Sequence, residues 1–226
     1  MYKLWLLGFL LCWLAQPLQA ARPSETESET TEVLEQLETE FQEQQLREAE
    51  EALRQAQAYE QGNGVEQDDA AAVRFYKEAA ERGNSEAQLR LGILYRQRKG
   101  VQEEFRNKSR FSFGKTAFDF LFSSKMDQEA FRWLRLAAEQ GYSRAQWTLG
   151  IMYYDGYGVQ QDYVNAHMWF NVSAASYVND DAEGGDGVAK QRLGWSDGVE
   201  KKMTPSQIAD AKRLARECIR KKYKGC

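Results

Sequence analysis

Residues 141–174 read GYSRAQWTLGIMYYDGYGVQQDYVNAHMWFNVSA, and this stretch predicts two antiparallel helices joined by a tight turn at Gly156–Gly158. Small and large apolar residues recur at helical spacing on both sides of the turn. They are Ala145, Leu149, Gly150 and Tyr153 before it, and Ala166, Trp169, Phe170 and Ala174 after it. The small residues let the two helices approach closely, but such a hairpin cannot cover its own apolar face. Neighbouring hairpins are therefore needed to cover that face.

The rest of the chain supplies further copies of this hairpin. A step of 36 residues links Tyr59 to Tyr95 and Trp133 to Trp169, so we infer a repeating unit of 36 residues. A step of 58 residues, which is one unit plus 22, places an insertion between Val101 and Met126. This longer step connects Ala87, Leu91, Gly92, Tyr95 and Val101 with Ala145, Leu149, Gly150, Tyr153 and Val159. A helix-pair repeat of this length predicts a solenoid.

The spaced pattern A-Q-x-x-L-G-x-x-Y-x-x-G-x-G-V-x-x-D-x-x-x-A-x-x-W-[FY], at Ala145 to Phe170, resembles the Sel1-like repeat, a relative of the tetratricopeptide repeat. The first copy keeps Gly62 and Gly64, whereas the middle copy has Arg98 where the first turn glycine is expected. The resemblance covers about residues 49–177. It implies an all-α fold, a right-handed α-solenoid of about three helix-pair repeats with a C-terminal capping helix pair.

The expected division of the chain follows from these repeats. It comprises a signal peptide at 1–20, an acidic linker and N-terminal helix at 21–48, repeat 1 at 49–83, repeat 2 at 84–140 with an insertion at about 102–126, repeat 3 at 141–177, and a loop with capping helices at 178–226. Thr204 followed by Pro205, with Gln207 three residues after the threonine, predicts the start of the last helix.

The first twenty residues have the composition of a secretory signal peptide. One basic residue, Lys3, precedes an apolar run from Leu4 to Ala15, and small residues around Ala20 suit cleavage. We therefore expect a periplasmic or secreted protein, with an uncleaved membrane anchor as the alternative. Without this segment the chain has 29 basic and 34 acidic residues, a net charge of minus five that does not favour a nucleic-acid partner.

Two cysteines, Cys218 and Cys226, remain after cleavage, eight positions apart at the C-terminal end. They either pair, which would tie down the tail and contribute about 2 kcal/mol, or stay as free or intermolecular thiols. At the other end of the mature chain, residues 23–45 are rich in glutamate, and we expect disorder as far as about Glu32 before a helix begins. An acidic arm that binds a basic partner is a second interpretation of this stretch.

The insertion combines phenylalanines with basic residues, a composition that suits an anionic or apolar surface. Its candidate contact residues are Arg106, Lys108, Arg110, Phe111, Phe113 and Lys115. The alternative is a small helix that folds back and buries its own phenylalanines.

In stacks of this kind, the first helix of each pair lines the concave face, and residues between the packing positions face inward. The candidate partner-binding residues are Glu86, Leu89, Ile93, Arg96 and Gln97 in the middle copy, and Arg144, Trp147, Ile151, Tyr154 and Asp155 in the third. Tryptophan, tyrosine and arginine are typical of binding hot spots. Alternatively, Leu89, Ile93 and Ile151 simply pack against neighbouring helices.

The sequence contains no recognisable catalytic or metal-binding constellation. His167 is its one histidine, and a packing or surface role suits it better than catalysis. Two cysteines do not make the usual zinc site. We therefore expect no cofactor, no metal and no small-molecule substrate.

Three functions are compatible with these observations. The first is a non-catalytic interaction scaffold of the bacterial envelope that binds a protein or peptide on its concave face. The second is a binder of envelope lipid or peptidoglycan acting through the insertion. The third is a hydrolytic activity, which the sequence gives little reason to expect.

Overall fold

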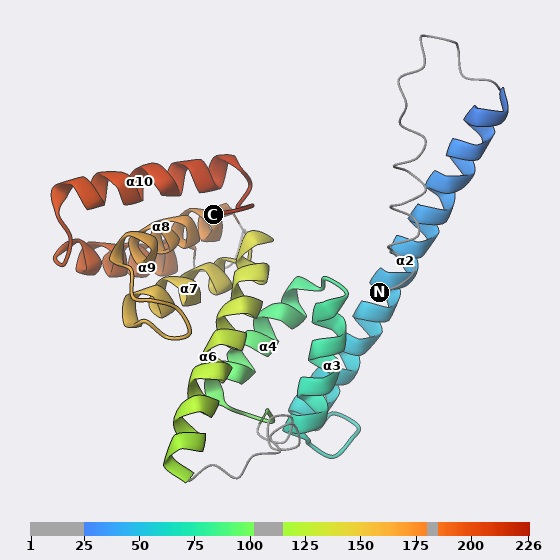
Figure 1. Cartoon of the computed structure of the whole chain (residues 1–226), viewed down its shortest axis with the longest axis horizontal. Coiled ribbons are helices and arrows are strands. Elements are labelled where there is room, and N and C mark those ends of the chain that lie inside the picture. Colours follow the sequence, from blue (N-terminus) through green and yellow to red (C-terminus); the bar gives the residue numbers. More distant parts are fainter. Residues whose placement is uncertain (1–24, 102–114, 180–184) are drawn as a thin grey trace. The chain divides into compact units, whose positions relative to one another are not determined.

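The computed structural model describes residues 25–101, 115–179 and 185–226, and this part of the chain is helical throughout its regular structure (Figure 1). Its contacts divide the chain into two compact units, residues 1–44 and residues 45–226. Helix α2 (Glu25–Gln61) contributes residues to both units. The expected fold class, an all-α solenoid of helix pairs, is confirmed.

Helix α2 differs from the expected acidic linker, because it is helical from Glu25 rather than from beyond Glu32. Between Glu25 and Gln61 the sequence has neither glycine nor proline, and glutamate, glutamine, leucine and alanine make up most of it. These residues all have high helix propensity, which outweighs the repulsion among the carboxylates. Gly62, with a φ of 73°, follows the last helical residue.

The second unit is a series of packed helices. After the end of α2 come α3 (Asp69–Glu81), α4 (Ser85–Gln97), α6 (Lys115–Glu139), α7 (Ser143–Asp155) and α8 (Tyr163–Asn179). Each helix from α3 to α8 packs against the next one along the chain. Equivalent aspartates cap the second helix of repeats 1 and 3. Asp68 accepts hydrogen bonds from the backbone N–H groups of Ala70 and Ala71 in α3, and Asp162 caps α8 in the same way.

Repeated residues occupy repeated surroundings in the core. A methyl group at Gly92 would lie 2.6 Å from Leu134 Cγ, and one at Gly150 would lie 2.6 Å from the Phe170 ring, so both glycines permit close helix contact. Two buried glutamines also match, because Gln88 Nε2 donates to the Ala80 carbonyl and Gln146 Nε2 donates to the Ala138 carbonyl, each at 3.1 Å. The sequence periodicity is therefore a periodicity of packing.

The second half of the insertion is not a loop. Helix α6 begins at Lys115 and continues without a break to Glu139, and Met126 within it is fully buried. The insertion thus extends the second helix of repeat 2 at its N-terminal end. The candidate surface residues Arg106, Lys108, Arg110, Phe111 and Phe113, and the side chain of Lys115, lie outside the described residues, so their role stays a prediction.

Two helices close the chain. Helix α9 (Gly185–Glu200) packs against α8, and α10 (Pro205–Arg220) packs on α8 as well. Thr204 and Gln207 form the predicted capping box at the start of α10. Cys218 and Cys226 form a disulfide, and Tyr223 between them lies against Gly141, so the tail is fixed to the turn that opens repeat 3. Among the described helices, none has both the length and the apolar character to cross a bilayer.

Candidate functional site

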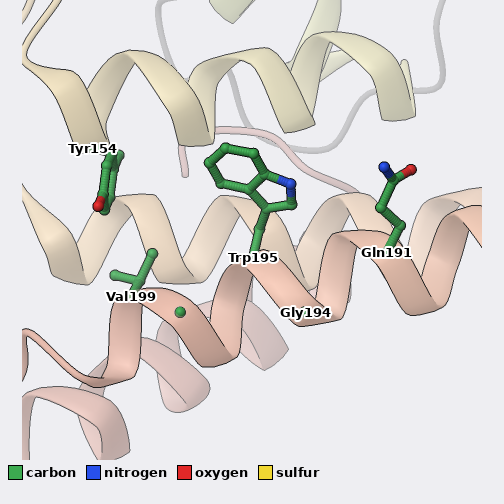
Figure 2. Close-up of a pocket in the computed structure, with 6 residues that line it drawn as sticks. Tyr154, Gln191, Gly194, Trp195 and Val199 are labelled. Carbon is green, nitrogen blue, oxygen red and sulfur yellow. The ribbon is translucent and has the colours of Figure 1, made fainter.

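An open groove of about 400 Å³ lies beside α7 and α9. It is lined by Tyr154, Gln191, Gly194, Trp195, Gly198 and Val199, which we call the α7–α9 groove. Figure 2 shows Gln191, Trp195 and Val199 projecting from α9 toward the side on which Tyr154 lies. The groove therefore joins repeat 3 to the C-terminal helices.

The sequence of α9 explains why this groove is open. Leu193-Gly194 follows Ala189 at the spacing with which Leu149-Gly150 follows Ala145, so α9 has the register of a first helix in a further repeat. In α4 and α7 the equivalent glycines are covered by Leu134 and Phe170 from the next helix. A methyl group at Gly194 would meet no atom within 4 Å. The groove thus lies where the covering side chain of a further helix would pack.

Trp195 is the largest side chain that lines the groove. Its ring packs edge-on against Trp147, with 6.3 Å between the centroids, and lies 5.9 Å from the Phe170 ring. These contacts fix the indole, yet 42% of the residue remains exposed. A rigid, half-exposed tryptophan loses little conformational entropy when it binds, which is why tryptophan is frequent in binding hot spots.

A positive charge lies beside the groove. Lys202 Nζ is 4.4 Å from the centre of the Tyr154 ring and 5.2 Å from that of Tyr163. A hydrogen bond to Tyr154 is the main reason why the pKa of Lys202 is raised above its ordinary value. The ammonium group therefore stays charged at this edge, where it favours a polar or acidic flank on a bound segment.

Polar side chains hold α9 in place. Asn171 Nδ2, on α8, donates to Ser196 Oγ on α9 at 2.7 Å. His167 Nε2 lies 3.0 Å from Glu200 Oε1, and Lys212 Nζ on α10 lies 2.8 Å from the same oxygen. Hydrogen bonds from Lys212 and then from His167 lower the pKa of Glu200. His167 is fully buried, so the structure gives it a packing role between α8 and α9.

The lining of the groove is mostly apolar, with few polar groups. Its lining consists of aromatic and aliphatic side chains, one amide, and two glycines whose backbone is accessible. In the described parts of the chain, no group of three histidine, cysteine or acidic side chains is placed to hold a metal ion. Such a lining suits an apolar side chain with hydrogen-bonding groups beside it.

The predicted binding residues of repeat 3 only partly meet at the groove. Tyr154 lines it, Trp147 supports Trp195, and Ile151 is buried against Phe170 and Val199. Arg144 and Asp155 are exposed at opposite ends of α7. Two of the five residues therefore form or support the site, and Ile151 takes the packing role that was the alternative.

The predicted residues of the middle copy lie on α4 and do not line the groove. Leu89 is buried in the main core, and Ile93 is half-buried against it. Glu86 accepts a hydrogen bond from Gln57 Nε2 at 3.2 Å, whereas Arg96 and Gln97 are exposed. A partner-binding role for the exposed α4 residues stays a prediction.

Sequence reasoning missed the part of the site that α9 contributes. These residues are Gln191, Gly194, Trp195, Gly198 and Val199, and Lys202 in the turn after α9 was missed with them. The dipeptide Leu193-Gly194 was the available signal, since it repeats Leu91-Gly92 and Leu149-Gly150. It stands 44 residues after Leu149 rather than 36, so a search at the repeat period does not find it.

Comparison with known proteins gives one family, a curated relative and several similar solved structures. The sequence model of the Sel1 repeat matches residues 54–84, 85–110, 127–142 and 143–176. A chitin synthase regulator, SKT5 of Saccharomyces cerevisiae, is 33% identical over 122 residues, which are 54% of this chain and 15% of the yeast protein. The chain thus spans a small part of that relative.

Two solved structures are similar to the chain. One is c5321, a protective antigen present in uropathogenic Escherichia coli strains and displaying an SLR fold, with 30% identity, a TM-score of 0.41, and coverage of 77% of this chain and 38% of the antigen. The other is a Sel1 repeat protein from Oxalobacter formigenes, with 28% identity, a TM-score of 0.44, and coverage of 64% of this chain and 86% of that protein.

Proposed function

Because this chain belongs to the Sel1 repeat family, whose members generally bind protein partners or act as regulatory adaptors, we propose that it is a non-catalytic adaptor. Its partner is a protein or peptide segment that binds in the α7–α9 groove. The segment places a large apolar side chain over Gly194 and against Trp195. Polar groups of the same segment lie near Gln191 and Lys202.

One observation carries this proposal. Leu134 and Phe170 cover Gly92 and Gly150, but no described atom lies within 4 Å of the equivalent position at Gly194. The chain therefore repeats a packing site and leaves its last copy without an internal occupant. A leucine or phenylalanine of another protein can make the contact that the two internal side chains make, and burying it stabilises a complex by about 1.5–3 kcal/mol.

We expect Trp195→Ala to weaken partner binding at least tenfold, because truncating a buried hot-spot tryptophan typically costs 2 kcal/mol or more, with about 1.4 kcal/mol per factor of ten. The probes are peptides selected from a displayed library against the whole chain. Their affinities are measured by fluorescence anisotropy with wild type and variant. Tyr157→Ala removes an exposed aromatic residue outside the groove and serves as the matched control.

The outcomes separate the two candidate surfaces. Equal affinity of the peptides for wild type and Trp195→Ala contradicts binding in the α7–α9 groove. If Arg96→Glu weakens binding in that case, the partner surface is the exposed part of α4, as the sequence alone predicts. Loss of affinity in Tyr157→Ala of the same size as in Trp195→Ala indicates non-specific contact with aromatic residues.

We propose that the adaptor acts in the bacterial envelope or outside the cell. The signal-like composition of residues 1–20 supports this location, and the pairing of Cys218 with Cys226 suits an oxidising compartment. The protein isolated from its native host should then begin at Ala21 and carry no free thiol. Mass spectrometry of the intact chain measures both features. A chain that retains Met1 in the cytoplasm contradicts this location.

A further inference from the structure

An exposed apolar stripe runs along helix α2 within the first compact unit. Val33, Leu34, Leu37 and Phe41 are 53%, 49%, 56% and 54% exposed. Together they leave on the order of a few hundred Å² of apolar side chain in water, which is the size of the largest apolar patch on a typical monomeric protein, and such patches are often functional. The α7–α9 groove does not involve these residues, so this stripe needs its own explanation.

The spacing of the stripe is that of a helix-recognition surface. Leu34, Leu37 and Phe41 are related as i, i+3 and i+7, and Val33 lies four residues before Leu37. At 100° per residue these four side chains share one face of α2. Anchors at this spacing are the ones through which two amphipathic helices pack side by side.

The charge of the same segment restricts what can bind there. Residues 25–45 contain eight glutamates and no lysine or arginine. Glu38 and Glu40 lie on either side of the stripe, whereas Glu32 and Glu35 lie on the opposite face of the helix. A second copy of the chain would bring a second row of carboxylates against the first, and an anionic surface would be repelled in the same way.

We infer that this stripe of α2 binds a basic amphipathic helix of another protein. The apolar seam of the partner covers Leu34, Leu37 and Phe41, and lysine or arginine residues flanking that seam lie beside Glu38 and Glu40. Apolar burial supplies most of the affinity. The charges select the partner and speed its association, and this contribution falls as salt is added.

The test uses the whole chain and a synthetic probe. The probe is a labelled peptide of about three heptads with leucine at positions a and d and lysine at e and g. Its affinity is measured by fluorescence anisotropy at low and at physiological salt. A second peptide carries glutamine in place of lysine, and so keeps the apolar seam without the charge.

Three variants distinguish the seam from general electrostatic attraction. The double variant Leu37→Gln with Phe41→Gln should bind the basic peptide more weakly, by about tenfold for each of the two substitutions. Each substitution removes an apolar side chain that the complex would bury. Glu38→Gln with Glu40→Gln should weaken binding several-fold and reduce its salt dependence. Glu32→Gln with Glu35→Gln changes the net charge equally on the far face, and should change the affinity less than twofold.

Each outcome supports or overturns the inference. It is supported if the flanking pair matters more than the far pair and the neutral peptide binds more weakly than the basic one. It is overturned if both glutamate pairs have equal effects, or if the neutral peptide binds as tightly as the basic one. It is also overturned if ultracentrifugation shows that the wild-type chain dimerises and the variant Leu37→Gln with Phe41→Gln does not. Circular dichroism checks that α2 stays helical in the apolar double variant, and the glutamate pairs decide the question if it does not.

Discussion

Replacing Gly158 by alanine is expected to lower the free energy of unfolding by about 3 kcal/mol or more, because two penalties combine at this position. Gly158 has a φ of 69°, which costs an alanine roughly 1–2 kcal/mol. A methyl group there would also lie 2.1 Å from the backbone carbonyl oxygen of Asp127, so the turn after α7 would have to move away from α6. Urea unfolding followed by circular dichroism measures the loss.

Gly64 is the matched control for this prediction. It has nearly the same backbone conformation, with a φ of 76°, and precedes a valine as Gly158 does, but a methyl group there would meet no atom within 4 Å. Gly64→Ala should therefore cost only about 1–2 kcal/mol. Equal losses at Gly64 and Gly158 would mean that the close approach to Asp127 contributes nothing.

The same contact recurs in repeat 2, which ties the prediction to the repeat rather than to one turn. A methyl group at Gly100 would lie 2.1 Å from the carbonyl oxygen of Asp69. Gly100 and Asp69 precede Gly158 and Asp127 by the same 58 residues. The turn glycine thus sets how closely each hairpin packs on the one before it, which explains why it recurs with the helix-pair unit.

The repeat register made the fold predictable from the sequence. Positions that recur at 36 or 58 residues, such as Tyr95 and Tyr153, fall in equivalent packing sites because the same side chains must cover the same neighbours in each copy. The boundary of α2 was less predictable. Its start depends on helix propensity competing with charge repulsion, and no repeat marks it. The available signal was Ser24 with Glu27 three residues later, a pattern typical of a helix start.

The candidate site was only half predictable, for a physical reason. Tyr154 and Trp147 lie on α7, which is part of a repeat. The face of α7 on which they lie can therefore be predicted from the repeat register. Trp195 reaches the site from α9, which follows the repeats at a shifted spacing, and Lys202 reaches it from the turn after α9. Sequence spacing does not reveal which surface such a helix covers, since that depends on long-range contacts such as the one from Asn171 to Ser196.

Leucine at Gly150 and leucine at Gly194 should have opposite effects on stability, although both glycines follow a leucine at the same point of the repeat. At Gly150 even a methyl group would lie 2.6 Å from the buried ring of Phe170, so Gly150→Leu should lower the free energy of unfolding by about 3 kcal/mol or more. At Gly194 the space is open, and Gly194→Leu should raise the stability of α9 by about 0.5–1 kcal/mol because leucine is the better helix former.

The stabilised variant then tests function without loss of fold. The new leucine at position 194 occupies the place proposed for the partner's apolar side chain, so library-selected peptides should bind Gly194→Leu at least about tenfold more weakly than wild type. Urea unfolding and anisotropy on the same protein preparations measure both effects. A Gly194→Leu chain that is as unstable as Gly150→Leu would contradict the open groove. A stable Gly194→Leu chain with unchanged affinity would instead place the partner elsewhere, because a filled groove cannot accept a second side chain.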